Sequence, residues 1–256
     1  MRDETLSLQG LTVAYKVAGQ GPVLLLLHGW GSSAARWQKI VKEVAERGVR
    51  VVALDLPGFG DSTPPHAVWG IKEYAEFVRA FLEKMEEKNV VLAGHSVGGQ
   101  IALQFALDNP SMVKKLVLMA PAAVRRPPGM REQALKGISK VLGYALYVAP
   151  VNVQTNARRI GYRLLRRPDY LRTYGVMREV FQKVIRQDLT PMFPSVSVPT
   201  VLIWGDKDRI TPLEDARLME DEISGAKLHI IKGSGHNLHV DAPKELAETL
   251  SLVVKS

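Results

Sequence analysis

The sequence predicts an α/β protein built on a mostly parallel sheet with helices on both faces. Short runs that are apolar throughout alternate with longer segments of helical periodicity, and the connections between them are short. Wholly apolar runs are typical of central strands covered on both sides, and their alternation with helices is typical of parallel sheets. Ligands bind such sheets at the carboxyl ends of the strands, so the loops at those ends are the candidates for function.

The expected elements follow in chain order. Residues 5–9 and 11–17 alternate apolar and polar positions around Gly10, which predicts an antiparallel hairpin. Buried strands are expected at residues 23–27, 49–54, 90–93, 115–119, 200–204 and 227–231. Helices are expected at residues 34–47, 71–88, 100–107 and 242–254. A further helix is expected to begin with Pro212, which suits the first helical position.

Between residues 122 and 190 the alternation stops. This segment has no convincing strand, several prolines and helical periodicity at residues 135–148, 157–165 and 170–185. It carries 14 Lys/Arg against 4 Asp/Glu, whereas the remainder has 20 against 22, so it holds the whole positive excess of the chain. The densest basic cluster consists of Arg158, Arg159, Arg163, Arg166 and Arg167. Such a cluster could attract anionic lipid surfaces or acidic substrates weakly, or it could be a solvated face that aids solubility.

The composition excludes several classes of function. No apolar run approaches the roughly 20 residues that span a bilayer, and the polar residues 1–4 lack the apolar stretch of a secretory signal. The absence of cysteine excludes disulfides and thiolate sites. Nucleic-acid binding is not indicated, because no recognised module accompanies the charge, and no zinc-type His/Glu cluster is visible. We expect a cytoplasmic protein, a monomer or homodimer, without a metal or organic cofactor.

A glycine-rich turn at residues 94–99 carries the strongest candidate for chemistry, Ser96. The turn joins an apolar strand to a helix, and Gly94 and Gly98 flank the serine where a Cβ would collide with the neighbouring backbone. The first N–H groups of the helix favour developing negative charge, so Ser96 is a candidate nucleophile. The alternative is a purely structural turn; the phosphate and dinucleotide motifs do not fit these residues.

A serine nucleophile needs a base and an orienting carboxylate, and loops after later strands supply both. Asp208 follows the strand expected at residues 200–204, with Asp206 as a close alternative. His236 lies in the last glycine-rich loop, with His239 as its alternative. The remaining histidines, His28, His66, His95 and His229, are expected to have structural or surface roles.

Five motifs occur together along the chain: His28-Gly29-Trp30-Gly31, residues 55–62, residues 94–98, residues 205–208 and Gly235-His236. In this order they resemble the α/β-hydrolase family, in which serine, acid and histidine follow one another in the same sequence. The resemblance implies an eight-stranded, mostly parallel sheet. It also implies a core of residues 1–121 and 191–256, with residues 122–190 inserted as a helical cap.

The resemblance further assigns roles within the site. It implies Asp208 as the acid, His236 as the base, and the backbone N–H groups of Trp30 and Val97 as the oxyanion hole. The Trp30 ring could face the substrate pocket or pack in the core. Other candidates for a pocket lining are Leu142, Tyr144, Tyr147 and Phe181, which could equally attach the cap to the core.

We therefore expect a serine hydrolase that cleaves small-molecule carboxylic esters of small to medium acyl chains through an acyl-enzyme. Serine rather than aspartate at the nucleophile position argues against the dehalogenases and epoxide hydrolases of the family. The motifs do not separate esterases from carbon–carbon bond hydrolases of the meta-cleavage-product type, lactonases or perhydrolases. A non-catalytic ligand-binding protein of the same fold is the alternative from another class.

Overall fold

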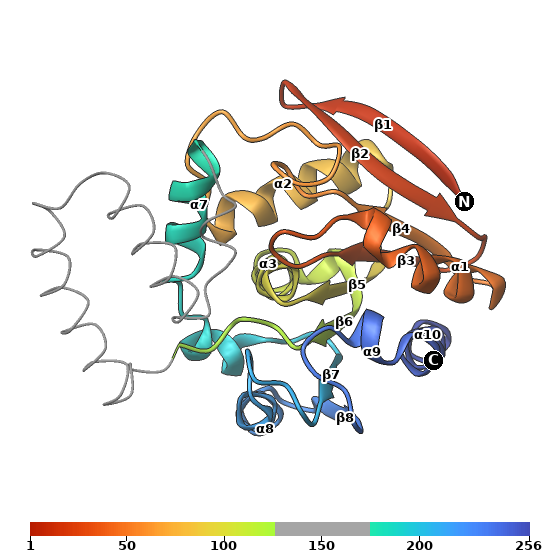
Figure 1. The fold of residues 1–256 in the computed structure, drawn as a ribbon, viewed down its shortest axis with the longest axis vertical. Coiled ribbons are helices and arrows are strands. Elements are labelled where there is room, and N and C mark those ends of the chain that lie inside the picture. Colours follow the sequence, from red (N-terminus) through yellow and green to blue (C-terminus); the bar gives the residue numbers. More distant parts are fainter. Residues whose placement is uncertain (126–174) are drawn as a thin grey trace, which may run out of the picture.

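The computed structural model describes residues 1–125 and 175–256, which form one eight-stranded sheet (Figure 1). The strand order is β1-β2-β4-β3-β5-β6-β7-β8. The strands are β1 (Arg2–Leu8), β2 (Leu11–Ala18), β3 (Val23–Leu27), β4 (Arg50–Leu54), β5 (Val90–His95), β6 (Val113–Met119), β7 (Thr200–Gly205) and β8 (Lys227–Ile231). Strand β2 pairs antiparallel with β1 and β4, and all other neighbours are parallel. This confirms the predicted fold class.

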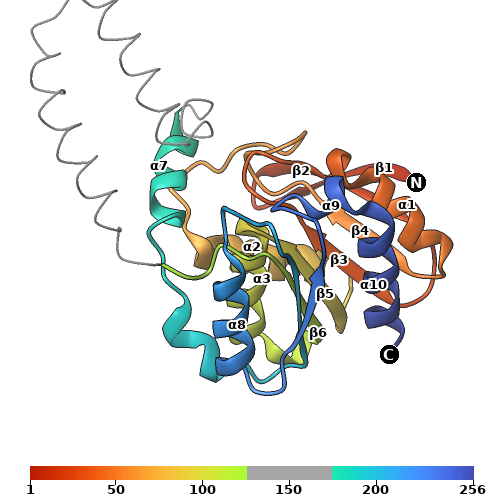
Figure 2. The same ribbon diagram turned by 60° about the horizontal axis from the view of Figure 1, so that its bottom comes forward.

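Helices cover both faces of the sheet (Figures 1 and 2). On one face lie α1 (Gln38–Glu46) and α10 (Pro243–Lys255), and on the other lie α2 (Ile71–Lys84), α3 (Val97–Asp108) and α8 (Leu213–Glu222). The remaining helices are η1 (Ala34–Trp37), η2 (Pro110–Met112), α7 (Val176–Val184), η3 (Thr190–Ser195) and α9 (Leu238–Asp241). Across the described part of the chain, every helix is too short or too polar to cross a membrane.

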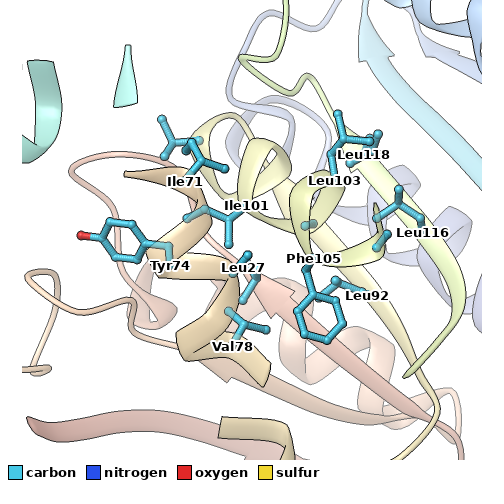
Figure 3. Packing of buried hydrophobic residues seen from close by; sticks show 14 of the residues in the cluster. Leu27, Ile71, Tyr74, Val78, Leu92, Ile101, Leu103, Phe105, Leu116 and Leu118 are labelled. Atoms are coloured by element: carbon cyan, nitrogen blue, oxygen red, sulfur yellow. The ribbon is translucent and has the colours of Figure 1, made fainter. Parts of the chain in front are cut away.

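The sheet separates two hydrophobic cores. Leu25 and Leu27 of β3 point into the core beneath α2 and α3, whereas Leu24 and Leu26 point into the core beneath α1 and α10. The strand is apolar throughout because both of its faces are covered. Figure 3 shows the first core, where side chains of α2 and α3 interdigitate with those of β3, β5 and β6. This packing fixes the carboxyl ends of the central strands, where the candidate residues lie.

Some boundaries differ from the sequence-based expectation. Helix α2 ends at Lys84 rather than residue 88, because Glu86 adopts a positive φ of 58° that no helix continues through. Helix α8 begins at Leu213, so Pro212 precedes the helix instead of opening it.

Several expectations lie outside the described residues. They include the pocket candidates Leu142, Tyr144 and Tyr147, the basic cluster of residues 158–167, and the helices expected at residues 135–148 and 157–165. Of the helix expected at residues 170–185, the described part is α7.

Candidate active site

Ser96 occupies a strained position between β5 and α3. Its φ of 53° and ψ of −115° are unusual for a residue with a side chain, and such backbone strain is typical of functional sites. The turn is tight because Gly98 lies against β3: a Cβ there would be 2.5 Å from the carbonyl oxygens of Leu27 and His28. The turn presents Ser96 next to the first N–H groups of α3, which have no acceptor within the helix.

A hydrogen bond joins His236 to Asp208, although the two residues follow different strands. The Nδ1–H of His236 donates to Oδ2 of Asp208 at 2.7 Å. The side chain of Asp208 is fully buried, and that of His236 is 10% exposed. Because Nδ1 carries the hydrogen in this bond, Nε2 of the neutral ring is left with the lone pair that a general base needs.

Three further donors hold the Asp208 carboxylate. The backbone N–H groups of Ile210 and Thr211 donate to its Oδ1 at 2.8 and 3.0 Å, and the Thr211 hydroxyl donates to its Oδ2 at 2.8 Å. Burial alone would raise the pKa of Asp208, but the hydrogen bond and charge of His236, together with these donors, lower the pKa below its ordinary value. The carboxylate therefore stays ionised and can stabilise a protonated His236.

The two alternatives from the sequence occupy other environments. Asp206 is exposed, and its carboxylate accepts a hydrogen bond of 2.6 Å from the N–H of Gly233. His239 is buried and stacks on Trp37 with ring centroids 4.4 Å apart. Burial is the main reason that the pKa of His239 falls to about 4. The hydrogen bond to Asp208 thus favours His236 as the base.

The loop after β3 lies against the turn that carries Ser96. Ser32 N–H donates to Gly29 O at 3.2 Å, which closes a turn with Trp30 at its second position. A Cβ on Gly29 would be 3.1 Å from the Cβ of Ser96, so the two turns are in direct contact. The His28 ring fixes the loop, because Nδ1–H donates to Gly29 O at 2.8 Å and Nε2 accepts from Leu56 N–H at 3.1 Å. The backbone of Trp30 is thereby held close to Ser96.

Asp55, which opens the motif at residues 55–62, has a structural role. Its buried carboxylate accepts from the N–H of Ala34 at 2.6 Å and from that of Asp61 at 3.1 Å. Gly60 lies so close that a Cβ would be 2.1 Å from the carboxylate. The motif therefore orders the loops after β3 and β4 beside the site.

A cluster of aromatic and thioether side chains, here called the wall, borders the loop after β3 that carries Trp30. The ring of Trp30 contacts those of Phe59 and Phe181, with centroids 4.8 and 4.9 Å apart. Phe181 comes from α7, and Met177 of the same helix places its sulfur against Gly58. Met177 and Phe181 are four residues apart, so they extend from the same side of α7 toward the loops after β3 and β4. Helix α7 therefore packs against both loops through apolar side chains.

Two further residues contact the site. Thr211, for which the sequence predicts no role in the site, places its hydroxyl 2.8 Å from Asp208 and 3.2 Å from Nδ1 of His236. His95, for which the sequence predicts a structural or surface role, places its Nε2 2.8 Å from the carbonyl oxygen of His236. Thr211 lies just beyond the motif at residues 205–208, whereas His95 lies inside the motif at residues 94–98. Within residues 1–125 and 175–256, no group of three or more His, Asp or Glu side chains is placed to hold a metal ion.

Comparison with known proteins places these features in a family context. A family model described as the alpha/beta hydrolase family matches residues 24–249. A 2-hydroxy-6-oxononadienedioate/2-hydroxy-6-oxononatrienedioate hydrolase from a Pseudomonas species is 27% identical, over 86% of this chain and 83% of its own. A pimeloyl-[acyl-carrier protein] methyl ester esterase from Vibrio vulnificus is also 27% identical, over 92% of this chain and 95% of its own. Among solved structures, an esterase from Exiguobacterium antarcticum is 25% identical with a TM-score of 0.76, over 97% of both chains.

Proposed function

The chain belongs to the alpha/beta hydrolase family, and from this premise we propose that it cleaves small-molecule carboxylic esters through an acyl-enzyme on Ser96. The observation that carries the proposal is the 2.7 Å hydrogen bond from His236 to the buried Asp208. His236 in turn is joined through its carbonyl to His95, the residue before Ser96.

The absence of cysteine in the whole chain agrees with a cytoplasmic location.

In the proposed first half-reaction, Ser96 Oγ attacks the ester carbonyl while Nε2 of His236 takes the hydroxyl proton. The carbonyl oxygen becomes an oxyanion, and the N–H groups of Trp30 and Val97 donate to it. The tetrahedral intermediate then collapses: the bond to the alkoxy group breaks, and the leaving oxygen takes the proton from His236. An acyl group remains on Ser96, and the alcohol leaves.

The second half-reaction repeats these steps with water. His236 takes a proton from the water, whose oxygen attacks the acyl carbonyl, and the proton is then returned to Ser96 Oγ as the carboxylic acid leaves. Asp208 stays ionised throughout and stabilises the imidazolium of His236. The wall formed by Trp30, Phe59 and Phe181 would hold the apolar part of the substrate, which suits small to medium acyl chains.

A panel of p-nitrophenyl esters of increasing acyl length tests the proposal, with Ser96→Ala measured alongside. We expect turnover of the shorter esters, and a loss in kcat on the order of 10⁵-fold or more in the variant, because nothing replaces the nucleophile. The proposal is wrong if no ester is cleaved, as expected of a non-catalytic ligand-binding protein. It is equally wrong if Ser96→Ala cleaves as fast as the wild type.

Hydrolysis of a carbon–carbon bond next to a ketone is the second candidate, and the Pseudomonas relative favours it, since that protein is named as a hydrolase of an oxo-dienedioate. The same serine, base and acid would serve. Vinylogous diketo acids, a lactone, and acetate with hydrogen peroxide belong in the panel. Faster turnover of the diketo acid than of every simple ester would select this candidate, and faster turnover of the lactone or peracid formation would select a lactonase or a perhydrolase.

A further inference from the structure

His95, the last residue of β5, connects the nucleophile turn to the loop that carries the proposed base. Its Nε2 lies 2.8 Å from the backbone carbonyl oxygen of His236. A carbonyl oxygen can only accept, so Nε2 carries the hydrogen and donates it. The rings of His95 and His236 are also in contact, with centroids 4.9 Å apart and planes tilted by 46°.

The environment of His95 keeps its ring neutral and in this tautomer. The residue is 4% exposed. Burial is the main cause that lowers its pKa to about 3, and the neighbouring charges of His236 and His239 act in the same direction, whereas Asp208 opposes them. The unprotonated Nδ1 has no hydrogen-bond partner and lies against Gly29, where a Cβ would be 3.0 Å away. The Nε2–H is therefore the single donor of a ring that does not change charge at working pH.

Two further rings pack against His95. Trp37 of η1 and His239 of α9 each place a ring centroid 5.6 Å from that of His95. His95 thus contacts four segments at once: the loop with Gly29, the loop with His236, η1 and α9. Its side chain cannot shift without displacing one of them.

We propose that His95 is a positioning residue, whose N–H fixes the main chain of His236 relative to Ser96. His236 is then restrained at two points: Asp208 orients its ring and His95 fixes its backbone. Both restraints are needed because proton transfer requires Nε2 to reach the Ser96 hydroxyl within hydrogen-bond distance. The inference rests on the proposed role of Ser96 and His236, and it adds a residue that does not itself touch the substrate.

The test compares two substitutions of His95. His95→Phe keeps an aromatic ring against Trp37 but removes the donor, whereas in His95→Gln the amide nitrogen stands near the position of Nε2 and restores it. We expect kcat for a short p-nitrophenyl ester to fall by roughly 10- to 100-fold in His95→Phe, as for a small misplacement of a catalytic group, with KM nearly unchanged. His95→Gln should recover most of this loss. His229→Phe, on the distant strand β8, is the matched control and should behave as the wild type.

A second readout does not depend on the chemistry of Ser96. The hydrogen shared by His236 and Asp208 should give a downfield proton resonance in the wild type and in His95→Gln, and a weakened one in His95→Phe. Equal kcat losses in the two variants, or an unchanged kcat and resonance in His95→Phe, would overturn the proposal. If Ser96→Ala retains activity, the proposed function fails, and the resonance alone then decides whether His95 positions His236.

Discussion

Thr211 lies at the contact between Asp208 and His236, the proposed acid and base. Its hydroxyl donates to Asp208 Oδ2, the oxygen that also accepts from His236. Thr211 itself is 5% exposed. Together with two backbone N–H groups, it keeps a buried carboxylate ionised and oriented. Such fully hydrogen-bonded buried networks are rigid, and each missing partner leaves a polar group unsatisfied.

Removing this hydroxyl should therefore weaken catalysis without unfolding the protein. We expect Thr211→Val to lower kcat for a p-nitrophenyl ester roughly tenfold, equivalent to about 1.4 kcal/mol for one lost hydrogen bond. Thr211→Ser keeps the hydroxyl and should remain close to the wild type. Steady-state kinetics of the two variants measure the difference, and equal activities would show that the hydroxyl plays no part in orienting Asp208.

The residues that the sequence predicted are those that carry a local motif. Ser96 is recognised by its flanking glycines, Asp208 by its position three residues after Gly205, and His236 by its glycine-rich loop. The contacts of Thr211 and His95 with His236 have no local signal, because they join segments that are far apart in the chain. Only the folded sheet, which aligns the carboxyl ends of its strands, brings these segments together.

Helix α7 forms one side of the wall beside the loop that carries Trp30. Lys183 of α7 pairs with Glu73 of α2 at 2.7 Å, and Glu73 also accepts from the N–H of Gly70. Both charged side chains are substantially exposed, so the pair contributes little stability by itself. The fully buried side chains of Val180 and Val184, which pack in the core beneath α2 and α3, attach the helix more strongly.

Phe181 should influence the choice of acyl chain. If its ring contacts the acyl group, Phe181→Ala will raise KM for a hexanoyl ester roughly tenfold. This change corresponds to about 1.4 kcal/mol of binding energy from the lost apolar contact. KM for an acetyl ester should change little, because the shorter chain does not reach the ring. Glu179→Ala, on an exposed position of the same helix, is the control. The measurement is the ratio of kcat/KM between the two esters. A ratio that does not change would mean that Phe181 only attaches α7 to the core.

The sequence also predicted most of the helices and strands. It predicted the residues at which some of them begin and end less accurately. Strand β5 continues to His95 and α3 starts at Val97, whereas the expected strand stopped at residue 93 and the expected helix started at residue 100. Glycines at 94, 98 and 99 favour neither structure by propensity. Their conformation is set instead by close packing: a Cβ on Gly94 would be 2.2 Å from Gly98 O.

At the scale of the whole molecule, buried neutral histidines make the fold sensitive to acid. Burial lowers the pKa of His95 to about 3 and that of His239 to about 4. An unfolded chain restores the ordinary value near 6.5, so the unfolded state binds more protons in acid than the folded state does. Neither histidine lowers stability above pH 6.5, where both states are neutral, but the free energy of unfolding decreases progressively as the pH falls from 6.5 toward the pKa values of the folded state.

His239→Phe should reduce this acid sensitivity while keeping a ring stacked on Trp37. Between pH 6.5 and pH 4, the loss in free energy of unfolding should be smaller than in the wild type by up to about 3 kcal/mol. Urea unfolding across this range measures the slope, with His229→Phe as a surface control. An identical slope in His239→Phe and the wild type would show that His239 is not kept neutral by the fold.

The parallel order of the sheet was predictable because strand and helix alternate, whereas the contacts across the site were not. We propose that Ser96, activated by His236, is the nucleophile, and mass spectrometry after treatment with an organophosphate measures this. We expect one adduct per chain, located on Ser96, absent in Ser96→Ala and formed far more slowly in His236→Ala. An unlabelled wild type, or an adduct that persists in Ser96→Ala, would contradict it.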